Sequence, residues 1–567
     1  MKTFSITTLG CRVNHYESEQ LAALFRGRGL TPASSPGEAD LRVVHTCSVT
    51  VQAASKSRQS VRRLDRLRVL NSGDATRGPS TDFSTTTLDQ SSILHTAGAG
   101  STAGSSGRRQ RVVVTGCWAT SHPKEAAALS GVDAVLGHHH DVNSELERLL
   151  DQWDAADEKR DAGSNSPEPG RDDGWMKGEA GTLAGLITCA NEPKIAKEVN
   201  GKLEGDENPC EGWNEGASGQ KSGARSQKSG MTLLPLLGER QGGHQRAFLK
   251  VQDGCDAHCT YCIIPQLRPR LWSKPVDEAV EEARRLVEAG HVEIVLTGIF
   301  LGAYGQATAL RRRQGGQVAE PLGELVDALC RRVPGLGRLR LSSLEPGDLT
   351  DELLTTLRSH RQVVPHFHLP LQSGSDVLLR RMNRQYGRRD YLEMIERLEG
   401  AFDEPAITTD VIVGFPGETD EEFARTVEVV DRARFIHIHA FSYSPRPKTA
   451  AARWTKDHVR GLVVNRRIDE LRERAAGHSL AFRRKFVGRT VELLVERPTA
   501  AEREIELMAG YQHGRCERYF AVHFEGSSEG SGFRVQGSGL RPGTLARVRV
   551  DRVTGTRTFG TLVGVGR

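Results

Sequence analysis

The 567-residue sequence contains no run of apolar residues long enough to cross a membrane. Its first residues, Met-Lys-Thr-Phe-Ser-Ile-Thr-Thr, also lack the apolar stretch of a secretion signal. Disulfides form in oxidising compartments, which a protein reaches with such a signal. We therefore expect a cytoplasmic protein without membrane attachment, whose ten cysteines are reduced thiols.

The sequence also lacks a strong excess of either charge, because 77 Lys and Arg residues stand against 72 Asp and Glu residues. The average hides a split along the chain. Residues 154–243 contain 11 basic and 16 acidic residues, a balance of −5, which leaves +10 for the remainder. A basic balance of this kind is expected where a protein meets phosphate groups.

Two segments lack the periodic apolar pattern of folded elements. Residues 71–107 contain 21 Ser, Thr or Gly residues among 37, and residues 154–243 are rich in Gly, Ser and acidic residues. We predict that the first is a low-complexity insertion and the second a mostly disordered acidic linker. Cys189 and Cys210 lie in this linker, and we assign them no role.

Cys255, Cys259 and Cys262 lie close together in the run Gly-Cys-Asp-Ala-His-Cys-Thr-Tyr-Cys. Thiolates with C-x3-C-x2-C spacing reach three corners of a 4Fe-4S cluster and leave the fourth iron without a protein ligand. A structural zinc ion needs four closed ligands, and His258, between two of the cysteines, is badly placed to be the fourth. A disulfide and buried structural thiols are two further interpretations of these cysteines. The open iron indicates a reactive cluster rather than one that only transfers electrons.

Strand-like and helix-like segments alternate from this loop onward, which predicts a parallel barrel, complete or partial, with its chemistry at the carboxyl ends of the strands. Val276–Glu288 and Glu421–Val430 are two of the amphipathic helical segments. The predicted strands are Ala247–Gln252, Val292–Gly298, Leu339–Ser343, His366–Leu371, Ile407–Gly414 and Phe435–Tyr443.

A second set of three cysteines, Cys11, Cys47 and Cys117, is more widely spaced. Each follows a strand-like segment, so each is expected at the carboxyl end of a parallel strand, facing one crevice. Three convergent thiolates can hold a second cluster. The alternative is that all three are buried as small apolar residues.

The remaining cysteines and a histidine run receive no functional role. Cys330 is expected in a helix and Cys516 in a loop, both as structural or incidental thiols. Consecutive residues do not share one face of a helix or strand, so we expect a solvated loop rather than a metal site at His138, His139 and His140.

The C-terminal part follows a long basic helical pattern at Asp457–Phe486 and predicts a small β-barrel with strands at Thr490–Val495, Tyr519–Phe524, Leu545–Val553 and Arg557–Val563. Residues 481–567 contain 15 basic and 9 acidic residues, with three interleaved aromatic residues, Tyr511, Tyr519 and Phe520. Such a surface suits RNA, in which phosphates are bound by cations and bases stack on rings. An ordinary solvated barrel face is the alternative.

Arg58, Arg62 and Arg66 lie one helical turn apart on the helix expected after Cys47, and this row would suit a series of phosphates. A solvated helix face is the alternative there too. Four barrel arginines, Arg515, Arg518, Arg547 and Arg549, are further candidates for phosphate contact.

Several motifs resemble one known family. The cysteine loop with Tyr261 in its aromatic slot, followed by Ile-Ile-Pro265, is similar to the radical S-adenosylmethionine (SAM) superfamily. His368-Leu-Pro-Leu-Gln-Ser-Gly-Ser375 and Arg381-Met-Asn-Arg384 resemble its methylthiotransferase branch, as do Thr46-Cys-Ser-Val-Thr50 and Thr115-Gly-Cys117 around the second set of cysteines. Val487-Gly-Arg-Thr490 resembles the TRAM domain of tRNA-modifying enzymes.

The resemblance covers most of residues 1–152 and 244–567 and implies an α/β fold with three domains. These are an N-terminal methylthiotransferase domain with a parallel sheet (1–152), a radical SAM core built on a partial (β/α) barrel (244–482) and a small TRAM-like, RNA-binding β-barrel (483–567).

The resemblance also implies the cofactors, two 4Fe-4S clusters and SAM. The cluster on Cys255, Cys259 and Cys262 would bind SAM and cleave it to a 5′-deoxyadenosyl radical, and the cluster on the other three cysteines would carry the sulfur that becomes methylated. The implied partners are a tRNA substrate and an electron donor such as a flavodoxin or ferredoxin. The candidate SAM contacts are Tyr261, Glu345, Gln372, Ser373, Asp410, Gly414 and Gly417.

Shorter motifs resemble the enzymes that methylthiolate C2 of N6-threonylcarbamoyladenosine next to the anticodon. They are Leu9-Gly-Cys-Arg-Val-Asn14, Ser342-Ser-Leu-Glu-Pro-Gly-Asp348 and Asp410-Val-Ile-Val-Gly-Phe-Pro-Gly-Glu418. Isopentenyladenosine in tRNA and a ribosomal-protein aspartate are alternative acceptors. A non-catalytic RNA-binding iron-sulfur protein is the alternative from another class.

The sequence departs from the family pattern at three positions. Pro269 follows Arg268 where the family has Gly, Trp272 replaces an arginine, and Phe300 replaces an asparagine. Because proline fixes its own φ and restricts the residue before it, we expect a different loop shape beside the cluster. The effect on activity and substrate is left open.

Overall fold

The computed structural model describes residues 1–71, 110–138, 142–163, 245–310, 320–498, 510–525 and 540–566. Residues 1–148 and 232–567 form one compact unit. The predicted insertion at 71–107 lies outside the described residues except for Asn71, and so does the linker from 164 to 243, with Cys189 and Cys210. Residues 154–163 belong to the helix α5 (Val142–Gly163), so the linker prediction is wrong for its first ten residues.

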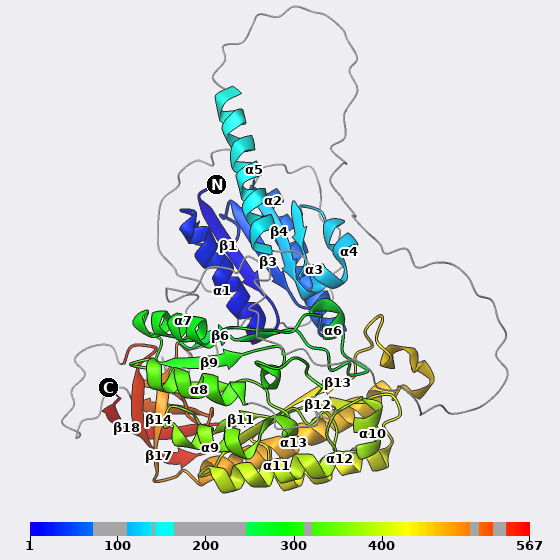
Figure 1. Ribbon diagram of the computed structural model, residues 1–567, viewed down its shortest axis with the longest axis vertical. Helices are drawn as coiled ribbons and strands as arrows, with labels where there is room; N and C mark the ends of the chain where they lie inside the picture. The colour runs from blue at the N-terminus through cyan, green and yellow to red at the C-terminus, as the bar shows by residue number, and fades with distance from the viewer. Residues whose placement is uncertain are drawn as a thin grey trace, which may run out of the picture. The chain divides into compact units, whose positions relative to one another are not determined.

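The N-terminal part forms a five-stranded parallel sheet in the order β2-β1-β3-β4-β5 (Figure 1). The central strands β3 and β4 are buried along their whole length, as expected for apolar runs in a sheet that is covered on both faces. The elements are β1 (Thr3–Thr8), α1 (Arg12–Gly27), β2 (Thr31–Pro32), β3 (Leu41–Thr46), α2 (Val51–Asn71), β4 (Arg111–Gly116), α3 (Cys117–Ser121), α4 (Pro123–Ala127) and β5 (Ala134–Leu136).

The central part is an open half-barrel of parallel strands, which confirms the predicted partial barrel. Two three-stranded sheets, β10-β9-β6 and β11-β12-β13, are joined by the parallel bridges Leu339–Val363 and Ser343–His368. The strands are β6 (Ala247–Lys250), β9 (Glu293–Thr297), β10 (Arg338–Leu341), β11 (His366–His368), β12 (Ala406–Val413) and β13 (His437–Ser442). A short hairpin of β7 (Gln252–Asp253) and β8 (Trp272–Ser273) extends from β6.

Amphipathic helices cover the outer face of the half-barrel (Figure 1). In α7, for example, Ala279, Val280, Ala283 and Leu286 recur at helical spacing, and all four are buried in the shared core. The helices are α6 (Ile264–Leu267), α7 (Val276–Glu288), α8 (Pro321–Arg332), α9 (Asp351–Ser359), α10 (Asp376–Arg381), α11 (Arg388–Ala401), α12 (Asp420–Ala433) and α13 (Gly461–Arg484).

The C-terminal part is a closed barrel in the order β14-β15-β16-β18-β17. Its strands are β14 (Thr490–Val495), β15 (Tyr511–Cys516), β16 (Ala521–Glu525), β17 (Leu545–Val553) and β18 (Thr558–Val565). The barrel was predicted, but β15 was not. Cys516 therefore lies in a strand rather than a loop, fully buried beside Phe520 and Phe524.

Among the helices in the described part of the chain, none combines the length and apolar character needed to span a membrane.

Candidate active site: two sets of three cysteines

The N-terminal cysteines lie at the same edge of the parallel sheet, as predicted. Cys11 precedes α1, Cys47 follows β3, and Cys117 begins α3 directly after β4. Side-chain hydrogen bonds hold these strand ends together. The Asn14 amide donates to the carbonyl oxygens of Leu9 and Thr46 (2.7 and 3.0 Å), and the Thr46 hydroxyl donates to the carbonyl of Thr115 (2.5 Å).

Gly10 brings the loop of Cys11 directly against Cys47. Its φ is +110°, and a Cβ atom at this position would lie 2.8 Å from Cys47 Cβ and 3.0 Å from Cys47 Sγ. A side chain is therefore excluded both by the backbone conformation and by the close approach. The glycine before Cys11 allows two of the three thiols to approach one another.

The donor set fits a cluster of metal cations, which becomes negatively charged overall once the three thiolates bind it. Burial, together with the neighbouring Cys11 and Cys47, raises the pKa of Cys117 to about 12 against the opposing effect of Arg268. Burial likewise raises the pKa of Cys47. Thiols that disfavour one another's ionisation lose their protons together only when a cation lies between them.

Arg446 supplies a second sign that an anionic group belongs here. The residue is only 4% exposed, and its guanidinium makes no hydrogen bond or ion pair with any residue that the structure describes. Burial lowers the pKa of Arg446, and the charge of the nearby Cys47 thiolate opposes this effect. A buried charge without a partner is costly, by several kcal/mol in order of magnitude. A negatively charged cluster on the three thiolates would neutralise it.

The second set, Cys255, Cys259 and Cys262, occupies the loop between β7 and α6. Gly254 enters this loop with φ +80°, and a Cβ atom there would lie 1.9 Å from the carbonyl oxygen of Arg270. Gln252 fixes the loop because its amide group donates to the carbonyl oxygens of Asp253 and Gly254, both at 2.8 Å. Its amide oxygen accepts the backbone N–H of Phe300 at 2.8 Å.

In the second set, burial raises the pKa of Cys255 and Cys262, and a cation lies beside Cys259. Burial raises the pKa of Cys262 to about 12, and Cys259 contributes to this effect. The Arg384 guanidinium donates to Cys259 Sγ at 3.2 Å and to the Tyr261 hydroxyl at 3.3 Å, and it forms an ion pair with Glu345. Arg384 therefore makes a charge-assisted hydrogen bond to Cys259, a candidate cluster ligand. The sequence alone assigned Arg384 no role beyond its place in the motif Arg381-Met-Asn-Arg384.

The remaining candidate SAM contacts differ in their surroundings. Asp410 faces the inner side of the half-barrel, with an oxygen 3.4 Å from His368 Nε2. Gln372 has φ +62°, and its backbone N–H donates to the carbonyl of Asp410 at 2.8 Å. Ser373 is fully buried, and its hydroxyl accepts the backbone N–H of Ser375 (3.2 Å). Its side chain therefore serves the loop conformation.

The backbone conformation requires glycine at positions 414 and 417. Their φ angles are +75° and +87°. A Cβ atom at Gly414 would lie 2.4 Å from a methyl group of Val464, and one at Gly417 would lie 2.9 Å from the Arg381 guanidinium. The turn after β12 is thus pressed against α10 and α13.

A buried charge network joins the loops of the two sets. Arg268, 5% exposed, pairs with Glu17 from α1 (2.8 and 2.9 Å) and with Asp253 (2.7 Å), two residues before Cys255. Its other nitrogen donates to His138 Nε2 at 2.9 Å, and this ring nitrogen lies 3.8 Å from Cys117 Sγ. Arg268 therefore links the loops of both sets of cysteines in spite of Pro269.

The prediction of a solvated loop is wrong for His138. Burial, and then Arg268, lowers the pKa of His138 to about 3, so the ring is neutral and accepts a hydrogen bond from the guanidinium. His139 and His140 lie outside the described residues. Beside this network, Cys117 packs against Ile263 and Leu267, which directly follow the second set of cysteines.

Of the two aromatic departures from the family pattern, Phe300 packs against the second set. It is 8% exposed and lies with Ala257, Cys255 and Cys259 in one apolar cluster. Trp272 lies opposite Asp253 in the short hairpin. Phe300 therefore places an apolar wall beside the cysteine loop.

The structure separates the predicted RNA contacts into exposed and buried ones. Arg547 and Arg549 are exposed on β17, and Arg552 lies over the ring of Phe559 at 4.3 Å. Arg518, in contrast, is 8% exposed and donates to the carbonyl oxygens of Glu404 and Asp403 in the half-barrel. The prediction of phosphate contact is wrong for Arg518.

Two of the three predicted surface rings are also engaged within the protein. Phe520 is buried in the barrel core. The Tyr519 ring lies between three guanidinium groups, 4.8 to 5.2 Å from its centre. These belong to Arg246, Arg340 and Arg515. Near Cys47, Arg58 pairs with Glu125 at 3.3 Å, Arg62 is exposed, and the side chain of Arg66 lies outside the described ones.

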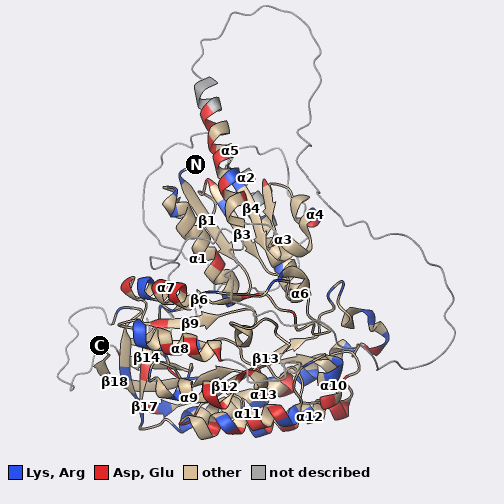
Figure 2. Ribbon diagram, viewed as in Figure 1, with Lys and Arg blue, Asp and Glu red and all other residues tan. Residues whose placement is uncertain are grey.

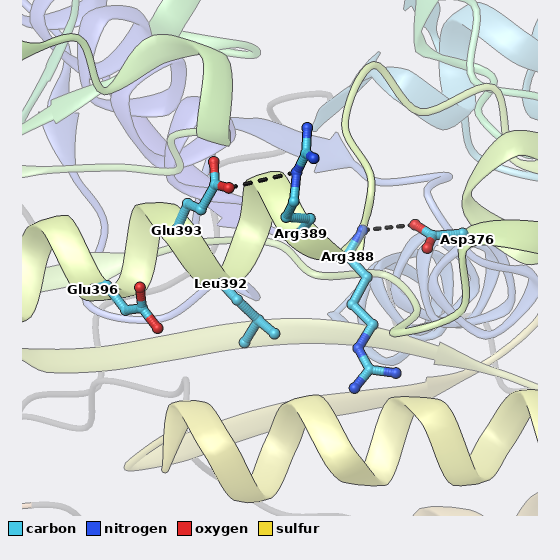
Figure 3. A pocket seen from close by; sticks show the side chains of 6 residues that line it. All are labelled: Asp376, Arg388, Arg389, Leu392, Glu393 and Glu396. Carbon is cyan, nitrogen blue, oxygen red and sulfur yellow. Dashed lines mark hydrogen bonds and ion pairs between the residues drawn. The ribbon is translucent and has the colours of Figure 1, made fainter.

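A surface pocket of about 390 Å³ lies along α11 and receives no role (Figure 3). Its charged groups already have partners: Arg389 pairs with Glu393 at 3.4 Å, and the Arg388 N–H donates to Asp376 at 2.7 Å. Figure 2 shows basic and acidic residues mixed along α11 and α12, as on an ordinary solvated face. None of its lining residues belongs to the cysteines or the candidate SAM contacts.

Comparison with known proteins agrees with this architecture. Residues 249–430 match the radical SAM superfamily, and residues 3–75 match the uncharacterized protein family UPF0004. The half-barrel with its cysteine loop is therefore a radical SAM core.

Three related proteins indicate to which branch of the radical SAM superfamily the chain belongs. A protein of Bacillus subtilis named threonylcarbamoyladenosine tRNA methylthiotransferase MtaB is 29% identical over 98% of both chains. A Chlamydia pneumoniae protein of the same name is 37% identical over 57% of this chain and 69% of its own length. A Maricaulis maris protein named tRNA-2-methylthio-N(6)-dimethylallyladenosine synthase is 29% identical over 100% of this chain and 98% of its own. The chain belongs to the tRNA methylthiotransferase family of radical SAM enzymes.

Proposed function

We propose that the protein transfers a methylthio group to C2 of N6-threonylcarbamoyladenosine next to the anticodon of tRNA. The observation that carries the proposal is the pair of cysteine sets on loops joined by Arg268, Glu17 and His138. A reaction that joins a carbon radical to a sulfur donor needs both cofactors near one substrate atom. The substrate is supported by the names of the relatives from B. subtilis and C. pneumoniae.

In this proposal each set of cysteines holds one 4Fe-4S cluster. Cys255, Cys259 and Cys262 hold the cluster that takes SAM, and the other set, Cys11, Cys47 and Cys117, holds the auxiliary cluster. When bound, the first cluster with SAM supplies a carbon radical and the second supplies sulfur. A flavodoxin or ferredoxin supplies the electrons.

The chain's own residues orient and shield these groups. Arg384 holds Cys259 and Glu345 in place, and Asp410 and Gln372 contact SAM from the strand ends of the half-barrel. Phe300 and Ala257 keep water from the cysteine loop, which matters because a carbon radical reacts with the nearest group.

Two exposed basic surfaces would hold the tRNA backbone. One lies on the C-terminal barrel, where Arg547 and Arg549 are exposed on β17 and Arg552 lies over the ring of Phe559, which contacts that of Tyr511. The other lies on α2, where Arg62 is exposed and Arg58 is half-buried beside Glu125. Cations that bind phosphates give affinity, and exposed rings stack on bases.

The M. maris relative, which matches 100% of this chain, is named for the dimethylallyl compound. Isopentenyladenosine is therefore a second candidate substrate. Mass spectrometry of tRNA nucleosides from a strain that lacks the gene separates the two. We expect the 2-methylthio derivative of threonylcarbamoyladenosine to disappear while its precursor accumulates. Loss of the 2-methylthio isopentenyl compound instead would assign the second substrate, and unchanged nucleosides would contradict both.

A further inference from the structure

The inner face of the half-barrel carries a group of imidazole rings around one carboxylate. Strand register places His368 and His437 beside Thr408, and His439 beside Asp410. Because side chains alternate along a strand, His366 shares this face with His368. The rings contact one another: His437 Nε2 lies 3.3 Å from His439 Nδ1, and the rings of His368 and His439 are 6.0 Å apart.

His366 lies deepest in this group, with its ring 4.9 Å from that of Tyr519, and its nitrogens lack hydrogen-bond partners among the described residues. It is 3% exposed, and neither ring nitrogen forms a hydrogen bond within the described part of the protein. Two neighbours, Arg340 on β10 and Ser342 directly after it, are similar, since Arg340 Nη2 and the Ser342 hydroxyl are also buried without a hydrogen bond. Buried polar groups are normally satisfied, and each exception costs roughly 1–3 kcal/mol. Several such groups on one face indicate a site built for a polar ligand.

Arg12, the first residue of α1, brings a positive charge near this group of rings. It follows the candidate ligand Cys11 directly and is close enough to influence the charge of His366 and His439. Its guanidinium has neither a hydrogen bond nor an ion pair among the described residues. Arg12 thus adjoins an auxiliary cysteine in the chain, acts electrostatically on two of the imidazole rings, and has no ion-pair partner among the described residues.

Among the charges around this face, Arg340 is the one that is least neutralised. Arg246, Arg338 and Arg340 all pair with Glu293, but Arg246 and Arg338 also pair with Glu496 and Glu492, so Arg340 has only the shared carboxylate. Burial lowers the pKa of Arg340 even though Glu293 lies 3.0 Å away, and Arg246 adds to this effect. Burial, then Arg340 and Arg12, lowers the pKa of His366 well below its ordinary value, so its ring is neutral and can donate one N–H.

We propose that Arg12 and His366 bind the carboxylate of the threonylcarbamoyl group and thereby select this nucleoside over isopentenyladenosine. The inference rests on the proposed function, because it concerns the substituent on the base that is methylthiolated. An isopentenyl group has no charge and no hydrogen-bonding atom, so it would leave Arg12 and His366 unpaired. A site built to pair with a polar group strongly rejects an analogue that lacks it.

The test measures binding of four anticodon stem-loop RNAs to the full-length, cluster-loaded protein. The RNAs carry threonylcarbamoyl-, glycinylcarbamoyl- or isopentenyl-adenosine, or plain adenosine, at the same position. The glycinyl compound keeps the carboxylate but lacks the methyl and hydroxyl groups. We expect the wild type to bind both carboxylate RNAs at least about tenfold more tightly than the isopentenyl RNA.

Two disruptive variants and one conservative variant assign this preference to the proposed residues. Arg12→Gln and His366→Phe should weaken only the two carboxylate RNAs, each by about tenfold or more, and Arg12→Lys should retain part of the preference. Arg389→Gln, which removes an exposed arginine on α11, is the matched control and should change nothing. Iron content and affinity for the plain RNA check that each variant is folded.

The outcomes separate this inference from the proposed function. A preference for carboxylate RNAs that survives in both variants, or an equal loss of affinity for all four RNAs, overturns the inference. The proposed function still stands in that case if mass spectrometry shows methylthiolation of the threonylcarbamoyl RNA. Wild-type methylthiolation of the isopentenyl RNA alone would overturn both.

Discussion

Four arginines around the cysteines differ in whether the protein itself neutralises them. Arg268 and Arg384 have carboxylate partners, Glu17 with Asp253 and Glu345 respectively. Arg446 and Arg12 have no such partner among the described residues. The paired arginines hold the loops together. In the proposed function, the unpaired ones would meet an anionic cluster and a substrate carboxylate.

Arg446→Gln should lower the reduction potential of the auxiliary cluster. The reduced cluster carries one more negative charge, so a nearby cation stabilises the reduced form. A contact that contributes about 1.4 kcal/mol corresponds to roughly 60 mV for a one-electron couple. Redox titration followed by electron paramagnetic resonance measures the shift. Arg58→Gln, which neutralises a more exposed arginine already paired with Glu125, is the control. Equal shifts in both variants would contradict a specific role for Arg446.

Replacing each set of cysteines by alanine should separate the two clusters. The triple change at Cys255, Cys259 and Cys262 should leave about half of the iron and abolish cleavage of SAM. The triple change at Cys11, Cys47 and Cys117 should also leave about half of the iron but retain cleavage and lose sulfur transfer. Iron analysis and detection of 5′-deoxyadenosine provide the measurements. Unchanged iron in either variant would show that its thiols are not ligands.

At the scale of elements, regular patterns were predicted and irregular ones were missed. All six strands of the half-barrel were predicted, because their apolar runs alternate with amphipathic helices. Strand β15 was missed since His513, Gly514 and Arg515 interrupt its apolar pattern, and only the barrel around it makes it a strand. The first ten residues of the predicted linker, likewise polar in composition, continue α5.

Glu293→Gln should lower the free energy of unfolding by about 3 kcal/mol. Burial alone would raise the pKa of Glu293, but guanidinium groups outweigh it and lower the pKa to about 2 from 4.5. Each pKa unit corresponds to about 1.4 kcal/mol. The carboxylate therefore stabilises the fold fully above about pH 4.5 and progressively less as the pH falls toward 2.

Urea denaturation at several pH values tests this prediction. The difference between wild type and Glu293→Gln should be largest near neutral pH and should shrink below about pH 4.5. Glu393→Gln, at an exposed ion pair on α11, should change stability by no more than about 0.5 kcal/mol. A Glu293→Gln effect as small as that of the control would show that the three arginines do not depend on this carboxylate.

At the scale of the whole molecule, buried ion pairs connect the parts. Glu17, on α1 of the N-terminal part, pairs with Lys250 and Arg268 of the core, and Glu496 of the C-terminal barrel pairs with Arg246. Removing the C-terminal barrel would leave Arg246 and Arg338 with only the carboxylate of Glu293, which they share with Arg340. Its role in RNA binding is therefore better tested at its exposed residues.

Changing Arg547, Arg549 and Arg552 to Gln together should weaken tRNA binding and reduce its dependence on salt. Each lost phosphate contact lowers the slope of log affinity against log salt by roughly one unit. Fluorescence anisotropy at several salt concentrations gives both quantities. The control changes three exposed arginines elsewhere to Gln, namely Arg331, Arg389 and Arg472. It should leave the tRNA affinity and the salt slope unchanged. Equal effects in both triple variants would indicate a loss of net charge rather than of a binding surface.

The site was only partly predictable from the sequence. The six cysteines were identified because their spacing and their position after strands carry the chemistry. The partners were not identified, because Arg384 meets Cys259 across 125 residues and Arg268 meets Glu17 across 251. His138 was misassigned for the same reason, since its partner Arg268 is 130 residues away. Contacts of this range exist only in the folded chain.

The most direct test of the central claim follows one hydrogen atom. An anticodon stem-loop with deuterium at C2 of its threonylcarbamoyladenosine is incubated without oxygen with the reduced, cluster-loaded protein and SAM. We predict that deuterium appears in 5′-deoxyadenosine while the same RNA gains a methylthio group at C2. Unlabelled 5′-deoxyadenosine together with unchanged RNA would contradict the claim that this nucleoside is the substrate.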